Sequence, residues 1–230
     1  MKTRRKRKIA WLTLFIVGVM LVITPLITDA FYRRTVARTE EAFNENLTRI
    51  EENKLGLLKE LLEKENQRLF SERQETFLTQ AVSYETSPIN LADYGLTENI
   101  IGFIEIPSLE VKLPIYLGAS SKNMKLGAVH LTGTSYPIGG ENTNSVIAAH
   151  RGYYKTLMFR QIDRLKPGDV LYIESFDEIL EYKMVEAGII YPDEFNKLTI
   201  KEGKDMVTIF SCHPFPYGYQ RYVVYFERVR

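Results

Sequence analysis

The chain contains a single cysteine, Cys212, and this thiol is the strongest candidate nucleophile in the sequence. It ends the β-branched run 206–212, and the following segment, His213-Pro214-Phe215-Pro216, is not expected to continue a strand because proline has no amide donor. The thiol is therefore expected at a strand end beside a loop, where functional residues tend to gather. By residue type alone, the alternative is a small buried hydrophobe, which is the commoner role of a free cysteine.

His150 is the best candidate for a base that could serve this thiol. It closes the apolar run 146–149 and opens a turn at Arg151-Gly152. An imidazole titrates near neutral pH, so it can protonate a leaving amine and deprotonate an incoming one. The competing interpretation is a structural histidine at a strand end, which is more common. His213 follows Cys212 directly, but neighbours on an extended chain point to opposite faces, so we expect a structural or local role for it.

Arg221 is the third candidate, because it begins the last predicted strand nine residues after Cys212. A hairpin through the intervening loop would bring the two residues together. Arginine is always charged and offers a planar fork of donors, which could hold an oxyanion or a substrate carbonyl. The alternative is a surface salt bridge. For the remaining histidine, His130, we expect a structural role.

The elements that must position these residues are short strands separated by turns. This pattern of short strands and turns begins near residue 100 and predicts a mostly β fold, either a barrel or a sandwich. Helical spacing of apolar residues predicts one short helix over 156–165. The predicted strands are Ile101–Ile106, Val111–Leu117, Ser145–Ala149, Val170–Glu174, Ile179–Tyr191, Met206–Cys212 and Tyr222–Glu227.

The N-terminal part of the chain has a different composition. Residues 9–28 form an uncharged apolar run, and twenty residues in a helix span about 30 Å, the thickness of a bilayer core. Six basic residues within 1–8 predict a cytoplasmic N-terminus. We expect an uncleaved transmembrane anchor, since the run is longer than the apolar core of a signal peptide; a cleaved signal peptide is the alternative.

Between the anchor and the strands, residues 29–99 are predicted to form a helical stalk and linker. An amphipathic helix is expected from 33 to about 83, divided in two near Gly56, and it would either pack on the outside of the barrel or act as a spacer or cover. The expected organisation is therefore a basic tail (1–8), an anchor (9–28), a stalk and linker (29–99) and a catalytic barrel (100–230).

Composition excludes several classes of protein. The net charge is +1, and removing the six basic residues of the tail leaves −5, which argues against a nucleic-acid binder. One cysteine permits no intramolecular disulfide and no cysteine-rich zinc site. We expect neither a metal nor a cofactor.

The residues resemble the sortases, cysteine transpeptidases of Gram-positive cell surfaces, and within them the pilin-polymerising class C group. The similarity covers about 101–228. Three stretches carry it, GFIEIPSLEVKLPIYLG (102–118), HLTGTSYPIGGENTNSVIAAHRG (130–152) and TIFSCHPF (208–215), together with the position of Arg221. The last stretch is similar to the TLxTC signature of the family, with Ile209 and Ser211 as substitutions.

The resemblance implies a closed eight-stranded β-barrel and a defined reaction. Cys212 would attack an LPXTG-type sorting motif to give a thioester, His150 would act as general acid and then base, and Arg221 would orient the substrate and stabilise the oxyanion. Thr208 and Ser211 would contact the substrate. An amine then resolves the thioester, which in class C is a pilin lysine and in housekeeping sortases belongs to a peptidoglycan precursor.

Two class C features are missing from the sequence. No Asp-Pro-aromatic lid motif occurs between 83 and 99, where Asp93-Tyr94 is a weak substitute, and no apolar run follows the barrel. The alternatives to pilus polymerisation are therefore a housekeeping-type sortase, a non-catalytic membrane-tethered barrel for pilus assembly, and a cysteine protease that hydrolyses its substrate.

Overall fold

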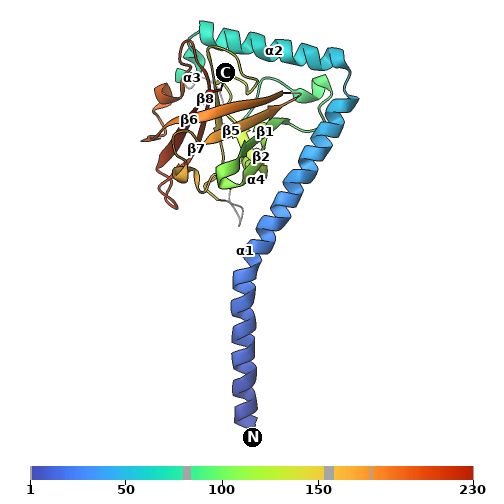
Figure 1. Cartoon of the computed structure of the whole chain (residues 1–230), viewed down its shortest axis with the longest axis vertical. Coiled ribbons are helices and arrows are strands. Elements are labelled where there is room, and N and C mark those ends of the chain that lie inside the picture. Colours follow the sequence, from blue (N-terminus) through green and yellow to red (C-terminus); the bar gives the residue numbers. More distant parts are fainter. Residues whose placement is uncertain (1, 80–83, 153–157, 177, 230) are drawn as a thin grey trace.

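The computed structural model describes residues 2–79, 84–152, 158–176 and 178–229. Two long helices lead into a β-barrel (Figure 1). The helices are α1 (Lys2–Arg49), α2 (Glu52–Ser71), α3 (Glu75–Leu78) and α4 (Ser121–Leu126). The strands are β1 (Ile100–Ile106), β2 (Val111–Leu117), β3 (Ala128–His130), β4 (Thr143–Ala148), β5 (Val170–Ser175), β6 (Glu178–Ile190), β7 (Asp205–His213) and β8 (Gln220–Arg228).

These strands close into a barrel in the order β1-β2-β3-β4-β7-β8-β6-β5, which confirms the predicted eight-stranded fold. The pairs β2–β3 and β4–β7 are parallel, and the remaining pairs are antiparallel. Every residue of β4 is buried, and Asn144 on this strand donates to the carbonyls of Leu198 and Thr199. Burial on both faces explains why β4 shows no alternation of buried and exposed residues.

One strand was not predicted, and one predicted helix is wrong. β3 is only three residues long, too short for an alternating pattern, and it exists because β2 and β4 pair with it on either side. Within 158–165 the chain forms turns and a short 3₁₀ segment, Ile162–Arg164, in place of the expected α-helix. Met158 has a φ of 36°, which no α-helix accommodates. The rest of that prediction falls on 156–157, outside the described residues.

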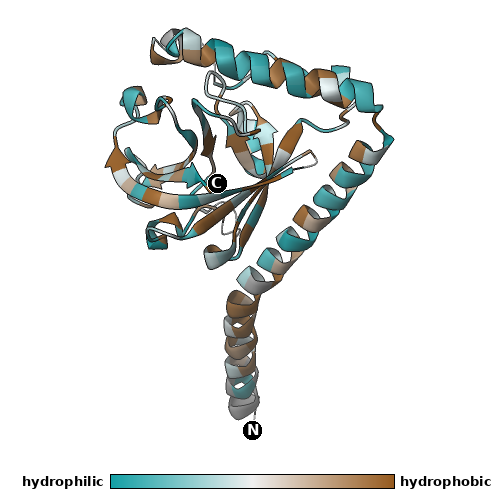
Figure 2. Ribbon diagram, turned by 45° about the horizontal axis from the view of Figure 1, so that its top comes forward, coloured by the Kyte–Doolittle hydropathy of each residue, from teal (hydrophilic) through white to brown (hydrophobic). Residues whose placement is uncertain are grey.

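The break between the first two helices lies at 50–51, so the predicted division at Gly56 is wrong, and Gly56 lies inside α2. The chain turns there because Glu51 takes an extended conformation, with a ψ of 131°. Hydrophobic and hydrophilic residues alternate around α2 (Figure 2), and its apolar side buries Leu58, Leu62 and Leu69. The amphipathic pattern therefore reports a helix packed on the outside of the barrel.

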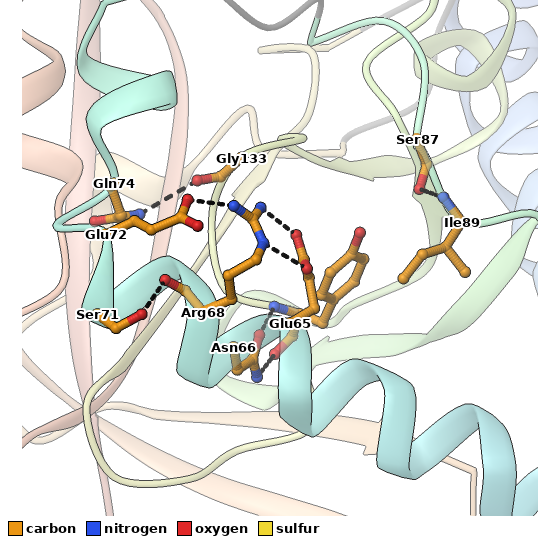
Figure 3. Close-up of polar contacts among 10 residues, drawn as sticks. Glu65, Asn66, Arg68, Ser71, Glu72, Gln74, Ser87, Ile89 and Gly133 are labelled. Atoms are coloured by element: carbon orange, nitrogen blue, oxygen red, sulfur yellow. Dashed lines mark hydrogen bonds and ion pairs between the residues drawn. The ribbon is translucent and has the colours of Figure 1, made fainter.

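Two amide side chains fasten this helical region to the barrel loops (Figure 3). Buried Asn66 accepts from the backbone N of Tyr136 at 2.7 Å and donates to its carbonyl at 3.3 Å. Gln74 donates to the Gly133 carbonyl and accepts from the backbone N of Ile200. These bonds satisfy backbone groups that no strand pairing reaches.

The helix α1 packs against the barrel through its C-terminal half. The Tyr32 hydroxyl donates to the Leu126 carbonyl at 2.9 Å, and the rings of Phe43 and Phe103 meet edge to face with centroids 5.6 Å apart. Lys112 forms an ion pair with Glu40 at 2.5 Å. Residues 10–23 of α1 are exposed and largely apolar, and α1 is the one helix among the described residues that is long and apolar enough to cross a membrane.

Candidate active site

The parallel pair β4–β7 brings the chain around His150 beside Cys212. Its register matches Ile147 with Ile209 and Ala148 with Phe210. The pairing continues past the end of β4, because the backbone N of Ala149 donates to the Phe210 carbonyl at 3.4 Å. Extending the register by two residues places His150 level with Cys212 on the neighbouring chain.

Cys212 and Arg221 are direct cross-strand partners in the antiparallel pair β7–β8. Partners in register lie on the same face of a sheet. The Arg221 guanidinium donates from Nη1 to the carbonyls of Gly218 and Gln220, at 2.8 and 2.9 Å. These bonds hold the arginine against the loop that joins the two strands.

The structure therefore brings all three candidates to adjacent strand ends. The strands β4, β7 and β8 are neighbours in the barrel: His150 lies two residues after β4, Cys212 lies in β7 and Arg221 lies in β8. All three residues are partly exposed. An accessible thiol, an imidazole and a guanidinium at one edge provide a nucleophile, a proton carrier and an anion-binding fork.

The environment of His150 favours its neutral form. Burial lowers the pKa of the imidazole below its usual value of 6.5, because a charged ring loses hydration there. Its backbone carbonyl accepts from the Phe159 amide at 3.1 Å, which fixes the chain after β4. A neutral imidazole at neutral pH can take a proton from an incoming amine.

Gly218 is a site residue that the sequence analysis missed. Its φ is +68°, and a Cβ placed there would lie 3.3 Å from the Cβ and 3.7 Å from the Sγ of Cys212. Its backbone N donates to the Pro214 carbonyl at 2.9 Å, closing a turn over the thiol. Glycine therefore permits both the left-handed backbone and the close approach to the thiol.

Arg151 is a second residue that the sequence analysis missed, although it follows His150 directly. It is 8% exposed, and its guanidinium lies 2.5 Å from Asp163 and 2.8 Å from Nδ1 of His213. It also donates to the Cys212 carbonyl at 3.5 Å. Its Cζ lies 6.0 Å from the centre of the Tyr222 ring.

These groups form a layer behind the three candidates. Arg151, His213 and Tyr222 each follow one candidate by a single residue, and side chains alternate between faces along a strand. We therefore assign His213 the local structural role expected for it. The sequence did contain a signal for this layer. The period of two along a strand, applied to the three strand ends together, places the residue after each candidate on the opposite face.

Thr208 and Ser211, the predicted substrate-binding residues, lie beneath the surface. Thr208 is fully buried and donates to Oδ1 of Asn144 at 2.8 Å, and Ser211 is 2% exposed and donates to the Ala149 carbonyl at 2.8 Å. Both hydroxyls tie β7 to the β4 chain. We therefore propose that they position the two strands, in place of the predicted contact with substrate.

The third histidine occupies the barrel interior, as expected of a structural residue. His130 is 1% exposed, its Nε2 lies 3.0 Å from the Ser135 carbonyl, and its ring stacks on Tyr136. Burial lowers its pKa to about 4.

Asp93 of the Asp93-Tyr94 pair accepts from Nδ2 of Asn90 in the loop before β1. Within the described residues, no cluster of His, Cys, Asp and Glu has a geometry that could hold a metal ion.

Comparison with known proteins decides the family. The sortase domain family model matches residues 104–229, more than half of the chain. The chain belongs to the sortase family. This sortase is therefore a member of a family of cysteine transpeptidases, as its single thiol suggested.

Curated relatives of this sortase belong to several named groups. It is 30% identical to Sortase D of Bacillus subtilis (strain 168) over 132 residues, which cover 56% of this chain and 63% of that protein. It is 25% identical to Sortase A of Listeria monocytogenes serovar 1/2a over 208 residues, covering 90% and 84% of the two chains.

Solved structures similar to this sortase include class C enzymes. Sortase C1 of GBS Pilus Island 1 superposes with a TM-score of 0.74 and 28% identity, covering 84% of this chain and 98% of that one. Sortase C from Clostridium perfringens SM101 superposes with a TM-score of 0.63 and 30% identity, covering 84% and 99%. The similarity therefore includes much of the helical region as well as the barrel.

Proposed function

We propose that this sortase is a membrane-anchored transpeptidase in which Cys212 is the nucleophile, His150 the proton carrier and Arg221 the oxyanion and substrate ligand. The observation that carries the proposal is the register pairing of Cys212 with Arg221, with the His150 chain on the other side of β7. A thiol with an adjacent base and a fixed cationic donor can carry out nucleophilic acyl transfer.

The reaction has two steps. In the first, the Cys212 thiol passes its proton to His150 and its Sγ attacks the Thr carbonyl carbon of an LPXTG-type motif; the C–N bond to Gly breaks, and His150 gives the same proton to the leaving Gly amine. In the second, His150 takes a proton from an acceptor amine, which attacks the thioester carbon and breaks the C–S bond, and His150 then returns the proton to the released Cys212 sulfur. Arg221 would hold the oxyanion of each tetrahedral intermediate.

We propose a pilin lysine as the acceptor, and pilus polymerisation as the outcome. Support comes from the similarity to sortase structures named for pili, Sortase C1 of GBS Pilus Island 1 and the pilus-related Sortase C of Group B Streptococcus. The second candidate acceptor is the amine of a peptidoglycan precursor, and the Sortase A relatives from Bacillus anthracis and Listeria support it.

We further propose residues 1–8 as the cytoplasmic tail, 9–28 as a single membrane anchor, 29–99 as stalk and linker, and 100–230 as the extracellular catalytic barrel. The exposed apolar half of α1 supports the anchor, and the basic residues that precede it support a cytoplasmic N-terminus.

Mass spectrometry of the enzyme with an LPXTG-type peptide tests the chemistry. We expect an acyl adduct on Cys212, absent from Cys212→Ala and much reduced in His150→Ala and in Arg221→Lys, which keeps the charge but loses the donor fork. No adduct on the unaltered enzyme would favour the non-catalytic barrel. Release of free acid at an unchanged rate when amine is added would favour a protease.

Incubation with a purified pilin or with a peptidoglycan-type amine then tests the acceptor. A lysine-linked ladder of pilin supports polymerisation. A product formed only with the precursor amine would transfer the assignment to the housekeeping type, with Cys212 still the nucleophile.

A further inference from the structure

The barrel has two distinct ends, which strand directions define. The strands β4 and β7 are parallel, and both end at the candidate residues, while β8 starts there and runs back. We call this the catalytic end. At the opposite end β4 and β7 begin at Thr143 and Asp205, and the loops there are tied to α2 and α3 through Asn66 and Gln74.

The turn between β1 and β2 also lies at the catalytic end. β3 is parallel to β2 and antiparallel to β4, so β2 begins where β4 and β7 finish. In this turn Glu110 pairs with Arg33 of α1 at 3.5 Å. Further along α1, Asn46 bonds the Gly95 carbonyl and the Thr97 amide, just before β1 begins at the opposite end. The helix α1 therefore runs along the barrel from its catalytic end to its opposite end.

This direction fixes how the barrel faces the proposed bilayer. The apolar run ends at Thr28, and Tyr32, which contacts Leu126, comes four residues later, about 6 Å along a helix. Figure 1 shows the connection between β7 and β8 on the side of the barrel toward the N-terminal half of α1, with α2 on the opposite side. The catalytic end is thus the end nearest the membrane.

Part of the surface at this end carries residues that are typical of a membrane interface. The connection between β7 and β8 exposes three aromatic side chains, Phe215, Tyr217 and Tyr219, with 54%, 80% and 61% of their surface accessible. Beside α1, the short helix α4 exposes Lys122 and Lys125. The rings of Tyr217 and Tyr219 have a polar tip and favour the headgroup layer, and lysines are attracted to anionic lipids.

We propose that the aromatic loop 214–219 and α4 contact the headgroups of an anionic phospholipid bilayer, so that the candidate site opens toward the membrane surface. The inference rests on the membrane anchoring proposed above. It commits to lipid as the occupant because the anchor, the C-terminal end of α4, where Leu126 contacts Tyr32, and the loop lie toward one end of the molecule (Figure 1). The competing occupant of the exposed rings is the substrate peptide.

Depth measurements on the full chain in lipid nanodiscs test this proposal without using activity. In a Cys212→Ser background, the substitutions Tyr217→Cys, Lys125→Cys and Glu202→Cys each provide one thiol for a fluorophore. Glu202 is exposed in the turn before β7, at the opposite end of the strand that leads to the loop, and is therefore the matched control. The nanodiscs contain phosphatidylglycerol, with or without bromine on the upper part of the acyl chains.

We expect brominated lipid to reduce fluorescence at 217 and 125 by roughly twofold or more and to leave 202 unchanged, since interfacial groups lie within reach of the upper acyl chain. Aqueous iodide should give the reverse order. Equal quenching at 217 and 202, or rings reached by bromine only after substrate peptide is added, would overturn the proposal. Because the thiol nucleophile is absent from these variants, the result is independent of the adduct test for function.

Discussion

The guanidinium of Arg151 lies 2.8 Å from Nδ1 of His213, on the side of β7 opposite the Cys212 side chain. An arginine only donates hydrogen bonds, so Nδ1 must accept and the imidazole proton resides on Nε2. The same guanidinium bonds the Cys212 carbonyl and pairs with Asp163. The buried Arg151 therefore holds the segment that follows His150 against the end of β7, through the Cys212 carbonyl and the His213 ring.

Replacing Arg151 should impair thioester formation more than folding. We expect Arg151→Met to lower kcat/KM for acylation by about 10- to 100-fold, because small displacements of reacting groups are costly, and Arg151→Lys to recover part of the loss. Rapid-quench measurement of the Cys212 adduct across pH checks this. Arg164→Met, at an exposed arginine nearby, is the control and should behave like the unaltered enzyme. A purely structural role would lower the amount of folded enzyme and leave kcat/KM per folded enzyme unchanged at every pH.

Gly218 offers a test of the close approach to the thiol. We expect Gly218→Ala to slow acylation at least about tenfold, because the new Cβ would displace Cys212, and to cost about 1 kcal/mol of stability from its positive φ. Gly203→Ala is the matched control, since its φ is +73° and nothing lies within 4 Å of the added Cβ. The two variants should lose similar stability in urea unfolding, and only the first should lose acylation rate. Equal rates would contradict the packing argument.

The buried His130 should make stability depend on pH. Its pKa falls from 6.5 in the unfolded chain to about 4 in the folded one, so its contribution is complete above pH 6.5 and declines as the pH falls toward 4. The loss from this group is up to about 3 kcal/mol, at about 1.4 kcal/mol per pH unit. Urea unfolding at several pH values measures it. His130→Gln, which keeps a donor for the Ser135 carbonyl, should flatten the slope in this range.

The lowered pKa of His150 predicts how the rate of the second step, transfer of the acyl group to the amine, falls at low pH. Transfer of the acyl group to an amine requires neutral His150 as base, so the rate should stay high as the pH falls to 6.5 and decline only below it. The measurement is single-turnover aminolysis of the preformed thioester, at a constant concentration of unprotonated amine. A fall in rate with its midpoint above pH 6.5 would show that burial does not set the pKa of His150 in the working enzyme.

Local patterns in the sequence determined much of the barrel. Val111–Leu117 was predicted with the bounds of β2, because a short, mostly apolar run between turn residues favours a strand. Cys212 was expected at a strand end because two prolines follow it closely. The apolar length and flanking charges of residues 9–28 likewise need no tertiary contact to suggest a membrane segment.

Other features were decided only by tertiary structure. β3 is held by its neighbours, the turns around Met158 override a helical spacing, and the helix break at 50–51 owes nothing to Gly56. The cross-strand register of Cys212 with Arg221 and the burial of Arg151 join residues far apart along the chain. Such contacts depend on how closed strands align, and a period along one strand carries no information about its partner's register.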